Sequence, residues 1–355
     1  MRRSCPLLLQ LTVVLSLAVC ASASAQAFLY APGGVADRVS EFSVAPTGRL
    51  LPLTAPAVPT PSEPVAAVLT PNGRVLYTSE ARADSITGFR VGRNGRLAPD
   101  KRLVLPVGSQ PEGLAMAPSG RKLFGVMERG SSLVEYSVIR RSGDVRPKML
   151  SSAKTGSAPT AVITSASGRY VYVTNFRSNT VSQFVVGRGG KLRAMSPARV
   201  PTGAGPSDLY LSPVGRHVYV TNSLADTVTT YSIGWSGRLR AIAVAATGVD
   251  PVSIVVASDG MHVYVANYWS SSISTYVING GGGLTASPSA PVYTLMGPSA
   301  LVASRRVLYV ASSFDNRIVS YPISAAGGLG SGSPTQNAPV AAGPDALALD
   351  ENPPG

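Results

Sequence analysis

The sequence predicts an all-β protein, a seven-bladed β-propeller with four-stranded antiparallel blades. One observation is an aromatic residue that recurs seven times, in steps of 45 to 48 residues. A second is another aromatic residue, twelve positions after each of these. The two sets are Tyr30, Tyr77, Phe124, Tyr172, Tyr219, Tyr264 and Tyr309, and Phe42, Phe89, Tyr136, Phe184, Tyr231, Tyr276 and Tyr321. Repeats of this length are typical of propeller blades or helical pairs, and the lack of helical periodicity favours blades.

Each repeat begins with two strands joined by a tight turn. Around Tyr172 we expect strands at 170–174 and 180–186, because Val, Tyr, Thr and Phe prefer a pleated surface. Seven residues after the first aromatic, every repeat has a short polar residue, which favours a turn by bonding to nearby backbone. These residues are Asp37, Asp84, Ser131, Asn179, Asp226, Ser271 and Asn316.

Two further strands complete each repeat. A glycine turn opens the third strand, at Gly48, Gly95, Gly143, Gly190, Gly237, Gly282 and Gly327. A proline opens the fourth element, at Pro64, Pro111, Pro159, Pro206, Pro251, Pro298 and Pro344. Proline suits the first residue of a strand, where no backbone donor is needed.

The phase of the repeat predicts how the ring closes. The chain enters a blade at its second strand, near Phe28, and ends with a lone innermost element at 344–349. A carboxy-terminal strand that pairs with the first three strands removes the open edges. We therefore predict that 344–349 is the innermost strand of the blade that contains Tyr30, in a one-plus-three arrangement.

The first residues have the composition of a cleavable secretory signal. Two arginines precede an apolar run over 7–19, and small residues at 23–25 follow it. Lipid attachment at Cys20 is disfavoured, because Val19 stands where a lipoprotein signal has a small residue. We expect a signal peptide at 1–25, a propeller at 26–350 and a tail at 351–355. The expected localisation is secreted or periplasmic.

Cysteine content and hydropathy predict whether the mature chain has disulfides or a membrane-spanning helix. Both cysteines lie in the expected signal, so no disulfide is predicted. No later segment has the length of a membrane-spanning helix, so we expect no transmembrane segment after signal cleavage. We expect a monomer.

Basic and acidic residues are predicted to lie on opposite faces of the disc, and the formal net charge is +13. Counted from the centre of the ring, the turns between the innermost strand of a blade and the next strand, and the turns after the third strand, share one face. They carry Arg49, Arg74, Arg93, Arg96, Arg121, Arg140, Arg141, Arg169, Arg188, Lys191, Arg216, Arg238, Arg305 and Arg306. The opposite loops carry Asp37, Glu63, Glu80, Asp84, Glu112, Glu128, Asp208, Asp226, Asp250, Asp315 and Asp345.

The basic face has two interpretations. It could attract an anionic polymer, or its arginines could be solvated hairpin corners. No nucleic-acid-binding motif accompanies the charge, so nucleic acid is not expected as a partner.

Two repeats contain the motif Tyr-Val-Thr-Asn, at 172–175 and 219–222. These motifs resemble the YVTN-type repeats of the lactonase-like seven-bladed propellers, to which fungal muconate-lactonizing enzymes and bacterial propeller-type 6-phosphogluconolactonases are similar. The resemblance covers 28–349 and implies the propeller fold. Activity depends on the site residues, because one fold hosts many functions.

One blade carries the site that the resemblance implies. Active lactonases read approximately Pro-Arg-His at the start of its inner strand and Asn-Glu at the end of the next. Here Glu128 matches the family's glutamate, with Ser131 and Ser132 beside it. Glu112 and Gly113 stand in place of the arginine and histidine.

Histidine chemistry, metals and cofactors are not expected. His217 and His262, the two histidines of the chain, open strands on the face away from the implied site. The sequence has no paired histidines for zinc, no haem attachment motif and no phosphate-binding glycine loop. We expect no cofactor and no metal.

The candidate site lies at the acidic rim. Opening a lactone ring needs a base that activates water and a donor for the developing oxyanion. Glu128 and Arg129 are the candidate catalytic residues. Clustered carboxylates would raise one pKa toward neutrality. The candidate ligand-binding residues are Glu80, Glu112, Asn175, Arg177, Asn222, Asn267, Tyr268 and Trp269. Alternatively, these charges are solvated, and the rim aromatics pack between blades.

Two functions from different classes follow. The first hypothesis is an exported binding or scaffold module with a degenerate lactonase-like site, which takes a small polar ligand or carbohydrate at the acidic, aromatic rim. The alternative is a hydrolase that acts on sugar lactones or related small molecules, with Glu128 as base. An isomerase or lyase on acidic small molecules is a third hypothesis. The first two differ in whether Glu128 points into a central channel beside a cation.

Overall fold

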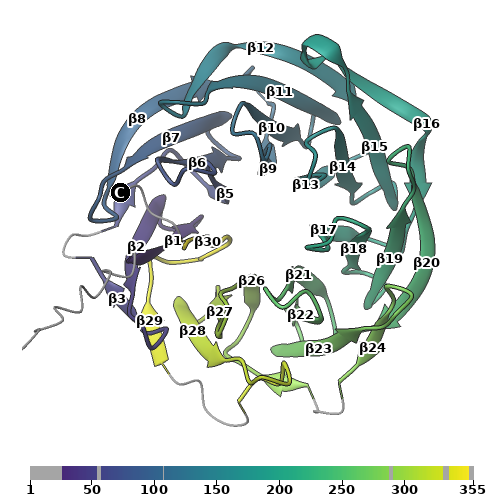
Figure 1. Cartoon of the computed structure of the whole chain (residues 1–355). Coiled ribbons are helices and arrows are strands. Elements are labelled where there is room, and N and C mark those ends of the chain that lie inside the picture. Colours follow the sequence, from purple (N-terminus) through teal and green to yellow (C-terminus); the bar gives the residue numbers. More distant parts are fainter. Residues whose placement is uncertain (1–25, 54–56, 107, 288–290, 331–335, 352–355) are drawn as a thin grey trace, which may run out of the picture.

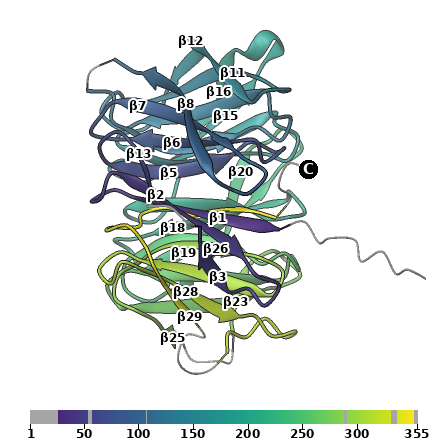
Figure 2. The same ribbon diagram turned by 90° about the vertical axis from the view of Figure 1, so that its left-hand side faces the viewer.

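Seven antiparallel sheets form a closed ring in the computed structural model (Figure 1). The structure describes residues 26–53, 57–106, 108–287, 291–330 and 336–351. Within each blade, consecutive strands run from the centre of the ring outwards, and a view from the side shows the blades stacked around the disc (Figure 2). The predicted seven-bladed propeller of four-stranded blades is confirmed.

The first four blades comprise these strands. Blade 1 contains β1 (Ala27–Gly33), β2 (Arg38–Val44), β3 (Leu50–Pro52), β4 (Val58–Pro59) and β30 (Ala348–Asp350). Blade 2 contains β5 (Pro64–Leu69), β6 (Val75–Glu80), β7 (Ser85–Val91) and β8 (Leu97–Val104). Blade 3 contains β9 (Pro111–Met116), β10 (Lys122–Met127), β11 (Ser132–Ile139) and β12 (Asp144–Lys154). Blade 4 contains β13 (Pro159–Thr164), β14 (Tyr170–Asn175), β15 (Thr180–Val186), a 3-10 turn η1 (Arg188–Gly190) and β16 (Leu192–Pro201).

The last three blades repeat the arrangement. Blade 5 contains β17 (Pro206–Leu211), β18 (His217–Asn222), β19 (Thr227–Ile233) and β20 (Leu239–Ala246). Blade 6 contains β21 (Pro251–Val256), β22 (His262–Asn267), β23 (Ser272–Ile278), β24 (Leu284–Ala286) and β25 (Val292–Tyr293). Blade 7 contains β26 (Pro298–Ala303), β27 (Val307–Ser312), β28 (Arg317–Pro322) and β29 (Gln336–Pro339). The innermost strands of blades 2 to 7 all begin at the predicted prolines.

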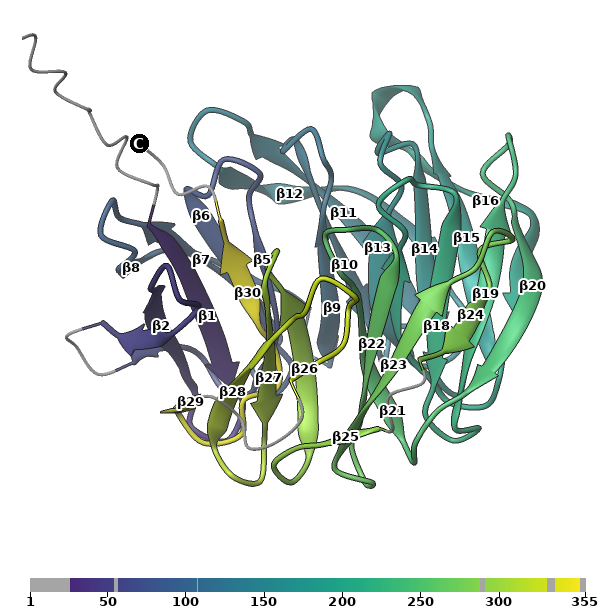
Figure 3. The same cartoon turned by 60° about the horizontal axis from the view of Figure 1, so that its bottom comes forward.

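The carboxy-terminal strand closes the ring as predicted. β30 pairs antiparallel with β1, with Ala348 opposite Tyr30, and it lies at the inner edge of blade 1 (Figure 3). Its bounds differ from the predicted 344–349, because Pro344 forms only an isolated bridge with Gly33. The pairing of every other innermost strand is also irregular near its start. The residues after each proline therefore depart from the ladder at the centre of the ring.

The polar turn residues have the backbone conformation that their sequence position predicted. All seven have positive φ angles, between 42° and 53°. Asp84 shows why a polar side chain is needed, because its two carboxylate oxygens accept hydrogen bonds from the backbone N–H groups of Gly108 (2.6 Å) and Gln110 (2.7 Å). Asp37, Asn179, Asp226 and Asn316 accept equivalent bonds from the loops that lead to their next blades. The turn residue of one blade thus fixes the start of the next.

Neighbouring blades are joined by tyrosine hydroxyls. In six repeats the first aromatic is a tyrosine whose buried hydroxyl donates to the carbonyl oxygen of the turn glycine of the following blade. The pairs are Tyr30 and Gly95 (2.8 Å), Tyr77 and Gly143, Tyr172 and Gly237 (2.6 Å), Tyr219 and Gly282 (3.1 Å), Tyr264 and Gly327 (2.8 Å), and Tyr309 and Gly48 (3.0 Å). Blade 3 has Phe124 at this position and so lacks the hydroxyl.

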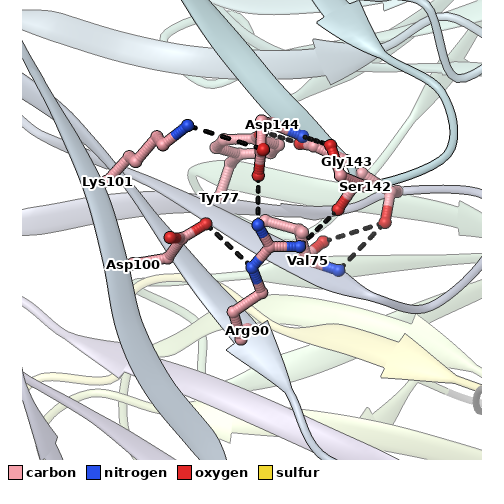
Figure 4. Close-up of polar contacts among 9 residues, drawn as sticks. Val75, Tyr77, Arg90, Asp100, Lys101, Ser142, Gly143 and Asp144 are labelled. Carbon is pink, nitrogen blue, oxygen red and sulfur yellow. Dashed lines mark hydrogen bonds and ion pairs between the residues drawn. The ribbon is translucent and has the colours of Figure 1, made fainter.

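The junction between blades 2 and 3 carries additional polar contacts (Figure 4). Arg90 donates to the carbonyl oxygen of Ser142 (2.6 Å) and pairs with Asp100 (2.9 Å) and Asp144. The hydrophobic core lies between the blades: Tyr77 and Tyr136, for example, pack in one cluster that spans blades 2 and 3.

The structure also bears on the targeting and membrane predictions. The expected signal at 1–25 lies outside the described residues. Among the helices of the described part of the chain, none is long and apolar enough to cross a membrane.

Candidate functional site

A central channel runs between the innermost strands of all seven blades, with a volume of about 390 Å³. Among the described residues that line it, the carboxylates are Glu112, Asp208 and Asp345. Glu112 and Asp345 directly follow the first proline of their innermost elements, and Asp208 comes one residue later. The innermost strands start from the loops between blades, so Glu112 and Asp345 lie at the mouth on that face. We call this the acidic face, and the opposite face, formed by the turns predicted to be basic, the basic face.

Glu112 has the electrostatic environment of a general base. Burial raises its pKa to about 7, and the negative charges of Glu128, Glu63 and Asp345 add to that rise. The side-chain amide of Gln110 donates to Glu112 Oε1 at 3.4 Å, which opposes the rise in part. A carboxyl group of this pKa is ionised in a large fraction of molecules near neutral pH and can still accept a proton.

Glu128, which the sequence predicted as a catalytic residue, is a neighbour of Glu112. It follows β10, is half-buried, and its backbone N–H donates to the carbonyl oxygen of Gln110 at 2.9 Å. Its negative charge raises the pKa of Glu112, so the two carboxylates lie close enough to interact electrostatically. The structure thus brings together two of the predicted site residues from consecutive strands of blade 3.

The predicted cations differ in their surroundings. Arg129 is exposed, and its Nε donates to Gln110 Oε1 at 2.9 Å. Gln110 therefore connects Arg129 to Glu112. Arg177 is exposed on the corresponding loop of blade 4, next to the loop that carries Arg129. A further cation of this face, Arg82, pairs with Glu63 at 3.5 Å.

Gln110 is a site residue that the sequence reasoning missed. It has a positive φ of 47° and its backbone N–H is held by Asp84 of the preceding blade. Its position directly before the opening proline of β9 was the available signal, because Glu112 and the residues after it line the channel.

The other two channel carboxylates have different roles. The pKa of Asp345 rises to about 6 through burial and the charge of Glu63, while a backbone bond from Gly34 lowers it in part. Burial also raises the pKa of Asp208 to about 6, but its oxygens accept bonds from the backbone N–H groups of Leu209 (2.8 Å) and Ile254 (3.1 Å). Asp208 thus holds two innermost strands together, whereas Asp345 contributes negative charge to the mouth.

Four predicted ligand-binding residues point into the blades instead of the rim. Glu80, Asn175, Asn222 and Asn267 occupy the last position of the second strand in their blades, and their side chains are fully buried. Each bonds to the hydroxyl seven residues later: Thr87 donates to Glu80 (3.0 Å), and the three amides donate to Ser182 (2.9 Å), Thr229 (3.0 Å) and Ser274 (3.0 Å). These contacts join the second and third strands of a blade. The four residues are left out of the site proposed below.

The predicted Tyr268 and Trp269 form an aromatic cluster with Phe314 on the acidic face. Tyr268 and Trp269, from blade 6, and Phe314, from blade 7, have ring centroids 5.3 to 6.2 Å apart. Trp269 is 66% exposed and Phe314 53% exposed. Trp269 and Phe314 therefore offer an apolar surface on the face that holds the channel mouth, whereas Tyr268 is half-buried and its hydroxyl accepts a 3.3 Å bond from Ser313 of blade 7.

Both histidines lie away from this mouth, as predicted. His262 bonds to Asp259 through Nδ1 at 2.6 Å, and His217 lies against Gly282, both on the basic face. In the described part of the chain, no three His, Cys, Asp or Glu side chains are grouped so as to hold a metal ion.

Comparisons with known proteins show one matching family and several similar structures. The family model "Lactonase, 7-bladed beta-propeller" matches residues 27–151 and 151–295. A putative 6-phosphogluconolactonase from Bacteroides fragilis superposes with a TM-score of 0.81 at 17% identity, covering 93% of this chain and 99% of that one. A putative 6-phosphogluconolactonase from Bacteroides uniformis has a TM-score of 0.79 at 21% identity, with 92% and 100% covered.

A third structure comes from a protein whose compartment is stated. The periplasmic gluconolactonase of Pseudomonas aeruginosa has a TM-score of 0.78 at 20% identity, with 91% of this chain and 98% of that chain covered. A search of curated proteins gave no match.

Proposed function

Because this chain belongs to the lactonase family of seven-bladed β-propellers, we propose that it hydrolyses a lactone at the acidic mouth of its central channel. The observation that carries the proposal is the Glu112–Glu128 pair at that mouth, in which the pKa of Glu112 rises to about 7. Family membership favours this hydrolase over the binding module that was the first hypothesis.

Glu112, rather than the expected Glu128, serves as the base in this proposal. Glu112 lines the channel, whereas Glu128 contributes its negative charge. The Glu112 carboxylate takes a proton from water, and the water oxygen attacks the lactone carbonyl carbon. The resulting oxyanion is stabilised by the guanidinium of Arg129, which Gln110 orients. When the ring C–O bond breaks, Glu112 returns the proton to the leaving oxygen, and the product is a hydroxy acid.

The surroundings of the mouth favour an uncharged sugar lactone as the substrate. Glu63, Glu112, Glu128 and Asp345 would repel a phosphorylated substrate. On the same face of the disc, Tyr268, Trp269 and Phe314 offer apolar ring faces of the kind that pack against sugars. In this respect the gluconolactonase of Pseudomonas aeruginosa, whose name includes no phosphate, is the nearer comparison. Because that protein is periplasmic, we also propose that this chain is exported through the segment at 1–25.

The test is hydrolysis of gluconolactone and of simple lactones by the purified protein, with the spontaneous rate subtracted. We expect Glu112→Gln to reduce turnover at least about a hundredfold, as expected for loss of a general base. Glu351→Gln, a matched change on the basic face, should leave turnover unchanged. Full activity of Glu112→Gln would exclude Glu112 as the base.

One observation still favours the binding-module hypothesis: Glu112 and Gly113 stand where the active members of the family have an arginine and a histidine. It predicts that the wild-type protein binds a sugar or lactone without turning it over. Calorimetric binding with no turnover across the whole lactone panel would favour it over the hydrolase.

A further inference from the structure

The basic face has a continuous surface over blades 2 to 5. The turns between the first two strands of successive blades touch one another: a Cβ on Gly120 would lie 3.4 Å from Pro71, and one on Gly168 would lie 3.6 Å from Pro118. The turn of blade 5 meets that of blade 4 in the same way, with Gly215 beside Ala166. Side chains from these turns can therefore act on one extended ligand.

Four arginines line a cavity of about 740 Å³ between blades 2 and 3. They are Arg74, Arg121, Arg140 and Arg141, all exposed, and no acidic side chain is among the lining residues. Arg74 donates to the carbonyl oxygen of Arg141 at 3.3 Å, which brings the two turns together.

The nearest acid on the blade 3 hairpin does not neutralise these arginines. Asp144 is bound by Arg90 and lies 3.5 Å from Lys101 (Figure 4). Among the described residues, no ion pair involves any of the four arginines of the cavity. The cavity thus concentrates uncompensated positive charge.

A second cavity, of about 600 Å³, lies between blades 4 and 5 and is lined by an aromatic pair. Trp235 is fully exposed in the turn after β19, and its carbonyl oxygen accepts a 3.4 Å bond from the Tyr170 hydroxyl. Arg169 stands 5.7 Å from the centre of the Tyr170 ring, and Arg216 lines the same cavity. An exposed indole beside cations is suited to a ligand with both a flat apolar face and negative charge.

Exposed cations continue the charge between and beside the two cavities, at Arg93, Arg96, Lys191 and Arg238. Two other acids of the basic face, Asp259 and Glu351, share a separate cavity with Arg305 and Arg306. The arc over blades 2 to 5 differs from that region because no acidic side chain is among the described residues that line its two cavities.

We propose that this arc binds an acidic polysaccharide. The arginines pair with its carboxylate or sulfate groups, since guanidinium matches both in bidentate geometry. Trp235 packs against the face of a sugar ring. A nucleic acid fits less well, because single strands gain affinity from successive aromatic platforms and Trp235 is the one exposed aromatic ring in the described part of the arc. The site lies on the face opposite the proposed lactonase mouth and does not depend on that activity.

The test measures binding of the wild-type protein to polygalacturonate, heparin and neutral dextran by calorimetry, at low and high salt. We expect binding to one or both acidic polymers, none to dextran, and weaker binding at high salt. Preference for polygalacturonate assigns carboxylates to the ligand, and preference for heparin assigns sulfates. Absence of binding to both acidic polymers overturns the proposal.

Variants locate the site. Replacing Arg74, Arg121, Arg140 and Arg141 by Gln should weaken binding at least about tenfold, and Trp235→Ala several-fold. A control that removes the same charge replaces the exposed Arg102, Lys148, Lys154 and Arg199 on the outermost strands by Gln, and it should change affinity less than about twofold. All variants should keep the wild-type unfolding transition. Equal losses in both quadruple variants, or tighter binding of an oligonucleotide of matched charge, would refute the proposal.

Discussion

The hydroxyl of Tyr309 donates a 3.0 Å hydrogen bond to the carbonyl oxygen of Gly48, a residue 261 positions away in the sequence. Tyr309 lies in blade 7 and Gly48 in blade 1, so this bond crosses the junction at which the ring closes. Gly48 has a φ of 82°, and a Cβ there would lie 2.3 Å from a methyl group of Val307. The same bond between a buried tyrosine and a turn glycine spans five other junctions.

We predict that Tyr309→Phe lowers the free energy of unfolding by about 1 to 2 kcal/mol, because a buried carbonyl loses its partner. Urea unfolding followed by far-ultraviolet circular dichroism measures this change. Tyr293→Phe removes the same atom from a side chain that is mostly exposed, and should change stability by less than about 0.5 kcal/mol. Equal effects of the two substitutions would contradict the role given to the buried hydroxyl.

A chain that ends at Gly343 should lose its cooperative unfolding transition and self-associate. The deletion removes β30 and leaves the inner edge of β1 unpaired, and an unpaired edge recruits other strands. A chain that ends at Asp350 keeps β30 and should behave as the full-length protein. Size-exclusion chromatography and thermal unfolding of the two truncations decide the matter, and identical behaviour would argue against closure by β30.

Glu80→Gln should stabilise the protein at pH 8 and not at pH 4. Burial raises the pKa of Glu80 from 4.5 to about 7, in spite of bonds from Thr78, Ser85 and Thr87. The folded state therefore favours the protonated acid, and this contribution is lost as the pH rises through about 7. The neutral amide avoids the loss, so we expect a gain of about 2 kcal/mol at pH 8. Chemical unfolding at both pH values measures it, and a destabilised variant at pH 8 would refute the argument.

Asp84→Ala should reduce both stability and activity, whereas Asp84→Asn, which keeps one of the two acceptor oxygens, should have a smaller effect. The carboxylate holds Gly108 and Gln110, and Gln110 contacts both Glu112 and Arg129. We expect Asp84→Ala to cost about 1 to 2 kcal/mol in unfolding free energy and to lower kcat more than it raises KM. Asparagine occurs at the equivalent positions of blades 4 and 7, which supports the conservative substitution. Normal kcat in Asp84→Ala would show that the loop does not position the site.

The pH dependence of lactone hydrolysis should report the Glu112–Glu128 pair. We expect kcat/KM to rise with pH through about 7, since the base must be ionised, and to level off above it. Glu128→Gln removes a negative charge that raises the pKa of Glu112, so the midpoint should move to lower pH. Initial rates in a pH series, corrected for spontaneous hydrolysis, measure this shift. An unmoved midpoint would mean that the two carboxylates do not interact.

The repeated side chains made most of the fold predictable. The strand at 180–186 and the proline starts of the innermost strands follow from patterns that occur in every repeat, so each copy supports the others. The predicted strand at 344–349 is shorter in the structure because residues 345–347 line the channel instead of pairing with β1. The side-chain pattern of the repeat did not indicate where that pairing stops.

The site was predictable only in part, because side-chain direction at a strand end depends on its neighbours. Glu80 and Asn175 end strands at the rim, and the sequence therefore suggested ligand contacts. Their partners Thr87 and Ser182 stand seven residues later, and a hydroxyl at that spacing was a usable sign of burial. Gln110 bonds to Glu112 on its own segment and to Arg129 in the loop after β10. The contact between these two segments depends on how the blade folds, so the sequence alone did not indicate it.

The six tyrosine bonds run in one direction around the ring, each from a blade to the next one along the chain. Except at the border between blades 3 and 4, where Phe124 replaces the tyrosine, neighbouring blades therefore meet through the same donor and the same acceptor. Loss of a repeat away from that border would leave a tyrosine facing a turn glycine; removal of blade 5, for example, would bring Tyr172 opposite Gly282. The number of blades in such a protein can thus change during evolution by recombination between repeats, without any new contact having to be invented at the seam.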